Sequence, residues 1–114
     1  IDLVATRYGC RIQGATEVAL TKLDVLSYMK EIPVCTQYEV NGEKTDDFPF
    51  TAVIDEAKPV LTTVPGWGCD ISGVRKYEDL PQAARDYVEY VEQAIGVHIS
   101  YVSVGAGRDE IIYR

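Results

Sequence analysis

The chain has 114 residues, of which 46% are hydrophobic and 25% are charged, and its formal net charge is −7. This length fits a single domain with one core, and the residue balance excludes a disordered or fibrous chain. The acidic excess argues against binding to nucleic-acid phosphates, because no run of basic residues gathers the cations on one face. We therefore expect a globular domain that does not bind nucleic acid.

Three cysteines, Cys10, Cys35 and Cys69, are far apart and form no C-x-x-C pair. This odd number favours reduced thiols in a cytoplasmic protein over a disulfide framework or a zinc ribbon. No apolar run approaches the ~20 residues of a membrane-spanning helix, so no membrane association is predicted. The chain opens at Ile1 without an initiator methionine or a basic leader, so we expect residue 1 to lie within a longer protein.

Apolar spacing and turn residues define the predicted elements. Asp2 is a plausible N-cap and Gly14 a plausible stop for the first helix, and Asn41-Gly42 is a strong hairpin signal. In chain order, we predict a helix at 3–13, a buried strand at 18–20, one or two helical turns at 24–30 that end before Pro33, strands at 34–40, 44–49 and 59–63, a loop at 65–68, a helix at 81–95, and strands at 99–104 and 110–113.

Helices interleaved with strands, plus one hairpin, indicate an α/β or α+β packing, and we predict an α/β fold with a mixed sheet, flanking helices and a β-hairpin. In open α/β sheets, ligands bind at the carboxyl ends of strands. Two predicted strand ends carry residues suited to binding: Thr21-Lys22-Leu23-Asp24 and Ser103-Val104-Gly105.

A carboxylate placed like Asp24 can accept hydrogen bonds from N1–H and the exocyclic amine of guanine. Adenine has an acceptor at N1 and no amine at C2, so a buried carboxylate rejects it by roughly 10⁴-fold or more. The apolar stem of Lys22 can lie against the base. The segment from Ser103 to Gly105 offers backbone N–H groups that could meet the guanine carbonyl. The alternative is that Lys22 and Asp24 are ordinary loop charges and that the second segment is a plain turn.

Other candidate sites are weaker. Gly9, Gly14 and Thr16 have the spacing of a phosphate-binding loop, but Ala15 replaces its lysine and the segment has a helical pattern, so we reject this interpretation. His98 has no nucleophile near it in sequence. The acidic pairs at 46–47 and 55–56 are interpreted as solvated turns rather than metal ligands, and the tyrosines at 87, 90 and 101 as packing residues.

Four segments in series resemble adenylosuccinate synthetases. They are Leu20-Thr21-Lys22-Leu23-Asp24-Val25-Leu26, Val64-Pro65-Gly66-Trp67, Leu80-Pro81-Gln82-Ala83-Ala84, and Val102-Ser103-Val104-Gly105 followed by Arg108. The resemblance covers essentially the whole chain. It implies the C-terminal part of a P-loop-NTPase-like fold, with residues 1–114 forming a single C-terminal domain of a longer enzyme.

In the family that the chain resembles, IMP and aspartate are joined with GTP and Mg²⁺ to give adenylosuccinate, GDP and phosphate, in purine biosynthesis. The resemblance implies a cytoplasmic homodimer and assigns guanine binding to Lys22, Leu23 and Asp24 with Ser103, Val104 and Gly105. It places the phosphate loop, the catalytic residues, the Mg²⁺ ligands and the IMP site upstream of Ile1. We therefore expect no catalytic or metal-binding residue here and no activity from this piece alone.

One departure from the family pattern is Ala106, where the family usually has proline after the glycine. This change loosens the loop but keeps its backbone donors. Two other interpretations of the chain remain open: a free-standing, non-catalytic guanine-nucleotide-binding module, and a structural module in which Lys22 and Asp24 are incidental.

Overall fold

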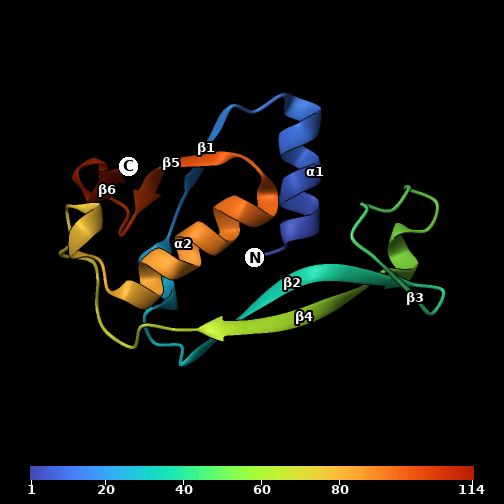
Figure 1. The fold of residues 1–114 in the computed structure, drawn as a ribbon, viewed down its shortest axis with the longest axis horizontal. Helices are drawn as coiled ribbons and strands as arrows, with labels where there is room; N and C mark the ends of the chain where they lie inside the picture. The colour runs from blue at the N-terminus through green and yellow to red at the C-terminus, as the bar shows by residue number, and fades with distance from the viewer.

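The computed structural model describes residues 1–114 as two helices and two three-stranded sheets (Figure 1). The helices are α1 (Leu3–Gln13) and α2 (Gln82–Ile95), and the strands are β1 (Glu17–Leu20), β2 (Glu31–Val40), β3 (Glu43–Thr45), β4 (Lys58–Pro65), β5 (His98–Ser103) and β6 (Ile111–Tyr113). Four 3₁₀ turns connect them: η1 (Leu23–Leu26), η2 (Ile54–Glu56), η3 (Tyr77–Asp79) and η4 (Arg108–Glu110). Neither helix has the length and apolar character needed to cross a membrane.

The first sheet has the order β1-β5-β6, with β1 parallel to β5 and β6 antiparallel to β5. Helix α2 lies between this sheet and the ribbon formed by β2 and β4, and α1 packs against α2 and β2 (Figure 1). The predicted α/β fold with a mixed sheet, flanking helices and a hairpin is confirmed. The strand predicted at 18–20 is not fully buried, however: Ala19 is exposed because β1 forms an edge of the sheet.

The second sheet is antiparallel, in the order β3-β2-β4, and contains the predicted hairpin at Asn41-Gly42. Both turn residues have positive φ, 53° and 81°, as a tight two-residue turn requires. The strand predicted at 44–49 is shorter than expected, since β3 ends at Thr45. The main partner of β2 is β4, whose register runs from Glu31 opposite Pro65 to Glu39 opposite Lys58.

Strand β2 begins before Pro33, a residue that we expected to precede the strand. Strand β3 pairs with β2 only at residues 38–40, so the edge opposite β4 has no neighbouring strand at Pro33. The Cys35 N–H points to that edge, where it donates to the Ile1 carbonyl oxygen at 3.0 Å. The nitrogen of Pro33, two residues earlier, faces the same edge, so its missing hydrogen costs no bond within the ladder.

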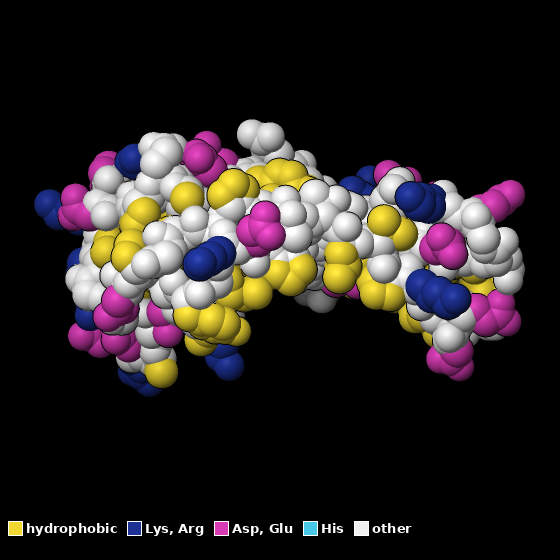
Figure 2. All heavy atoms as spheres, turned by 90° about the horizontal axis from the view of Figure 1, so that it is seen from below, with side chains coloured by type: hydrophobic (Ala, Val, Ile, Leu, Met, Phe, Trp, Pro, Cys, Tyr) yellow, Lys and Arg dark blue, Asp and Glu magenta, His cyan; other side chains and the backbone are white.

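Two clusters of buried side chains stabilise the fold. The main core contains 15 buried residues, drawn from both helices, both sheets and the connecting segments. A smaller cluster of Val4, Cys35 and Tyr38 lies where α1 meets the second sheet. From here on, "the arm" denotes residues 38–60, which extend from that cluster, and "the body" denotes the rest. Seen from below, charged side chains of both signs gather at the two ends of the molecule, with hydrophobic side chains between them (Figure 2).

Candidate functional site

The segment after β1 turns sharply into η1. Lys22 adopts the left-handed conformation, with φ 61° and ψ 39°, which costs a lysine about 1 kcal/mol or more. Its backbone N–H donates to Ser103 Oγ at 2.8 Å, and this bond joins the ends of β1 and β5. The next residue, Leu23, is 1% exposed and anchors the turn in the main core. This geometry fixes the position of Asp24.

Asp24 carries a buried oxygen without a partner. Its Oδ1 has no hydrogen-bond partner within the protein, while its backbone oxygen accepts from the Ser27 N–H at 3.1 Å. An unpaired buried acceptor costs about 1–3 kcal/mol, and more when it is charged. Such an atom in a native fold calls for a donor from outside the chain, and a ligand that offers N–H groups would supply one.

The loop after β5 is shaped by Glu110. Its carboxylate Oε2 accepts from the Gly107 N–H at 2.5 Å, and its backbone oxygen accepts from the Val104 N–H at 2.9 Å. A Cβ at position 105 would collide with this carboxylate, so a side chain there would push the end of the Glu110 side chain away from the loop. Residues 105–107 therefore form a folded loop that faces η1.

The two segments enclose one pocket of about 470 Å³, a size typical of small-molecule sites. The structure thus brings Lys22 and Asp24 together with Ser103 and Gly105, although about 80 residues separate the segments in sequence. The side chains of Leu23 and Val104 are buried and do not line this pocket. The residues that line it are Thr21, Lys22, Asp24, Val25, Ser103, Gly105, Ala106, Gly107 and Ile111.

A second cavity of about 480 Å³ lies beside the same turn and shares Thr21, Lys22 and Val25 with the first. Eleven of its fourteen lining residues are hydrophobic, contributed largely by β1, η1 and α2. Specific binding needs a few polar groups that fix a ligand's orientation. The first pocket has such groups in Asp24 and Ser103, so it is the candidate site.

His98 belongs to a structural cluster rather than to this pocket. Its Nδ1 lies 2.8 Å from Glu92 Oε2, which also accepts from the Ile99 N–H at 2.7 Å and from Arg114 at 2.6 Å. Burial opposes ionisation of Glu92, yet these hydrogen bonds outweigh it, so the pKa of the carboxyl lies below its ordinary value. The guanidinium of Arg114 also stacks 4.7 Å from the centroid of the Tyr77 ring. The cluster ties α2 to β5 and the C-terminus.

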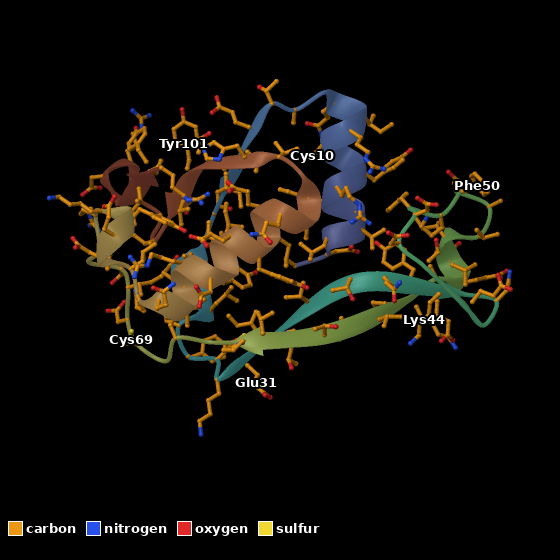
Figure 3. The ribbon with its side chains drawn as sticks, in the orientation of Figure 1. Cys10, Glu31, Lys44, Phe50, Cys69 and Tyr101 are labelled. Carbon is orange, nitrogen blue, oxygen red and sulfur yellow. The ribbon has the colours of Figure 1, made fainter.

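The other residues considered from sequence lie away from the pocket. Cys10 and Cys35 are buried and Cys69 is exposed, and all three thiols are free. Cys10 and Cys69 lie far apart, on α1 and in the loop after β4 (Figure 3). The acidic pairs at 46–47 and 55–56 are exposed in the arm. Tyr87 is buried and packs against Trp67, as the packing interpretation predicts, and Tyr101 packs edge-on against its cross-strand partner Tyr113.

Sequence reasoning missed Glu110, whose side chain holds the second segment. A signal was present, because a glutamate three residues after Gly107 can bond back to that backbone N–H at the start of a turn. It also missed Val25 and Ile111, which supply apolar walls of the pocket. No local pattern marks these two, since each is an ordinary apolar residue whose position depends on the tertiary fold.

The chain is an α/β structure with a pocket between the carboxyl ends of adjacent parallel strands, the place where open α/β sheets bind their ligands. The family profile described as adenylosuccinate synthetase matches residues 1–112. The chain belongs to the adenylosuccinate synthetase family.

Individual relatives agree with this assignment. The adenylosuccinate synthetase of Mycobacterium sp. (strain KMS) is 47% identical over 114 residues, and that of Mycobacterium tuberculosis (strain H37Rv) is 48% identical. The alignments cover 99% of this chain but 26% of each relative, so the chain spans about a quarter of their length. The structure of fully ligated adenylosuccinate synthetase from Plasmodium falciparum superposes with a TM-score of 0.92 at 29% identity, covering 100% of this chain and 28% of that one.

Proposed function

We propose that residues 1–114 form the guanine-recognition part of a GTP-dependent adenylosuccinate synthetase. Asp24 would accept hydrogen bonds from N1–H and the exocyclic amine of guanine, and Lys22 would lie along the base. Ser103 and the backbone N–H groups near Gly105 would bind the opposite edge, with Leu23 and Val104 contributing backbone contacts. The buried, unpartnered Oδ1 of Asp24 is the observation that carries this proposal.

The chemistry of that oxygen favours guanine over adenine. Guanine presents two adjacent N–H donors, whereas adenine presents the acceptor N1 and a C2–H to the same position. An unpaired carboxylate oxygen gains a donor from the first base and meets a repulsive lone pair on the second. Sites built around hydrogen bonds to a ligand reject analogues that lack them by roughly 10⁴-fold. The apolar wall from Val25 and Ile111 suits the faces of a planar base.

The parent enzyme in this proposal joins IMP and aspartate with GTP and Mg²⁺ in AMP biosynthesis, as a cytoplasmic homodimer. Family membership and the relatives' names support this part of the proposal. Phosphate binding, Mg²⁺ coordination and catalysis are assigned to the parts of the enzyme that these 114 residues do not include. In this proposal the chain determines which nucleotide base the enzyme accepts, and it is expected to be inactive alone.

The test is Asp24→Asn in the longer enzyme that carries these residues. An asparagine amide can donate to the C2 carbonyl of xanthine, where guanine has its amine. We expect kcat/KM for GTP to fall about 100-fold and XTP to become the better substrate, because the exchange reverses one donor–acceptor pair. Steady-state kinetics with GTP, XTP and ATP measures this.

Asp109→Asn is the matched control, because Asp109 is exposed beside the same loop and does not line the pocket. It should leave the nucleotide preference unchanged. A variant Asp24→Asn that keeps the wild-type order of GTP, XTP and ATP would contradict the proposal.

A further inference from the structure

The loop that follows β4 contacts the segment that follows η1. Trp67 Nε1–H donates to Ser27 Oγ at 3.0 Å, although 40 residues separate the two side chains in sequence. The indole also packs edge-on against the buried Tyr87 of α2, with ring centroids 5.9 Å apart. Trp67 therefore bridges the body's central helix and the turn that carries Asp24.

Gly66 brings the same loop into close backbone contact with this segment. Its N–H donates to the Lys30 carbonyl oxygen at 2.9 Å, next to the pairing of Glu31 with Pro65. A Cβ at position 66 would collide with the backbone oxygen of Met29, so no residue with a side chain fits without moving the backbone. The requirement for glycine here comes from the close approach and not from a positive φ.

Trp67 is two hydrogen bonds away from Asp24. The Ser27 side chain accepts from Trp67, and the Ser27 N–H donates to the Asp24 carbonyl oxygen at 3.1 Å. The turn η1 has four residues, and isolated 3₁₀ turns of this length have little stability of their own. Its conformation therefore depends on outside contacts: the packing of Leu23 in the main core, Ser103 on the side of β5 and Trp67 on the side of β4.

We infer that Trp67 is a positioning residue for base discrimination, acting through Ser27 to hold the carboxylate of Asp24 in the orientation that guanine requires. This inference rests on the proposed function. Trp67 does not line the pocket and does not touch the base. Its role is to hold η1 from outside the pocket, while Gly66 allows the close approach of the loop to the segment that follows the turn.

The test is Trp67→Phe in the longer enzyme, with the dissociation constants of GDP and IDP measured by calorimetry. Phenylalanine keeps an aromatic ring against Tyr87 and removes the donor to Ser27. IDP lacks the exocyclic amine, so the ratio of its dissociation constant to that of GDP reports how well Asp24 is placed. We expect GDP affinity to fall about fivefold to tenfold, the range for loss of one hydrogen bond, and the IDP/GDP ratio to fall at least threefold.

Ser27→Ala removes the acceptor of the same bond and should lower the ratio to a similar extent. The double variant should be no worse than either single one, because both substitutions break one contact. Additive losses would show that the two residues act separately and would overturn the inference.

Val4→Ala is the stability control. It removes buried methyl groups from the smaller cluster, which contains no residue of η1, and should lower the melting temperature without changing the IDP/GDP ratio. An equal fall in the ratio for Val4→Ala and Trp67→Phe would reduce Trp67 to a general structural role. Wild-type protein without preference for GDP over IDP would instead refute the guanine proposal. A preference that survives Trp67→Phe would refute the positioning role alone.

Discussion

The body and the arm are built from one chain but are stabilised very differently. The body encloses the 15 buried residues of the main core, including Ile99, Val102 and Val104 at 0% exposure. The arm has a single buried residue, Tyr38, and its tip leaves Phe50 83% exposed (Figure 3). The arm's order therefore rests largely on backbone pairing between β2, β3 and β4, with few apolar contacts behind it.

The candidate pocket draws all of its residues from the body. Its two segments are anchored by Leu23 and Val104, which are buried in the main core on the far side of the pocket wall. Rigid placement of polar groups requires such packed support, because a hydrogen-bonding site that shifts by about 1 Å loses much of its selectivity. We therefore expect the proposed guanine recognition to survive changes in the arm and to be lost when the core beneath β5 is changed.

The largest expected effect is that of Ile99→Ala. Truncating this fully buried side chain should lower the free energy of unfolding by about 2–5 kcal/mol, through lost burial and a residual cavity. Leu61→Ala in β4 is the matched change, because Leu61 is 59% exposed, and it should cost no more than about 0.5 kcal/mol. Urea unfolding of residues 1–114 measures both. Equal effects would show that burial does not separate the core from the exposed surface of the second sheet.

The second effect concerns Glu92, which ties α2 to β5 and to Arg114. Glu92→Gln should cost roughly 1.5–3 kcal/mol at pH 7, the range for hydrogen bonds to a charged group. Because the pKa of Glu92 is lowered by folding, its contribution is present above the unfolded value of about 4.3 and is lost as pH falls through the folded pKa.

The measurement is urea unfolding of both proteins between pH 7 and pH 3. The gap between wild type and Glu92→Gln should narrow toward acid. Glu78→Gln, at an exposed position in η3, should follow the wild type at every pH. A gap that stays constant down to pH 3 would mean that the charge of Glu92 is not what stabilises the cluster.

Much of the fold follows from local patterns in the sequence. The first helix spans 3–13 as predicted, because Asp2 caps it through the Ala5 N–H at 2.9 Å and Gly14 ends it in the left-handed conformation. The predicted strand boundaries were wrong where pairing with another strand, rather than a local pattern, decides the structure. Whether Pro33 fits within β2 depends on which edge of that strand lacks a neighbour, and the length of β3 depends on how far it pairs with β2 along the edge opposite β4.

In the candidate site, too, the local features could be predicted and the tertiary contacts could not. Asp24 and Ser103 were identified because strand ends are local features with recognisable residue types. The 2.8 Å hydrogen bond from the Lys22 N–H to Ser103 Oγ, which joins the two segments, follows from the parallel pairing of β1 with β5, and no local pattern encodes that pairing. Trp67 was visible as part of a motif, but its bond to Ser27 requires β4 to run antiparallel to β2 and return the chain to η1.

The smallest expected effect is that of Tyr38→Phe, at the end of the arm that meets α1. The Tyr38 hydroxyl donates to the carboxylate of Asp2, which also caps α1, so this hydrogen bond joins the arm to the N-terminal end of the helix. Tyr38→Phe should cost about 1 kcal/mol near neutral pH. Burial, and then the hydrogen bond and charge of Asp2, raise the pKa of Tyr38 above its ordinary value.

The sign of the pH effect follows from that shift. With the folded pKa above the unfolded value of about 10, the contribution of Tyr38 is complete below pH 10 and is lost as pH rises toward the folded pKa. Urea unfolding between pH 8 and 11 should show a shallower alkaline loss of unfolding free energy for Tyr38→Phe than for wild type.

Burial also raises the pKa of Tyr77 and Tyr87, so part of this alkaline loss remains in the variant. Tyr28→Phe, at an 83% exposed position, should reproduce the wild-type slope. Identical slopes for Tyr38→Phe and wild type would place the alkaline sensitivity entirely in the body.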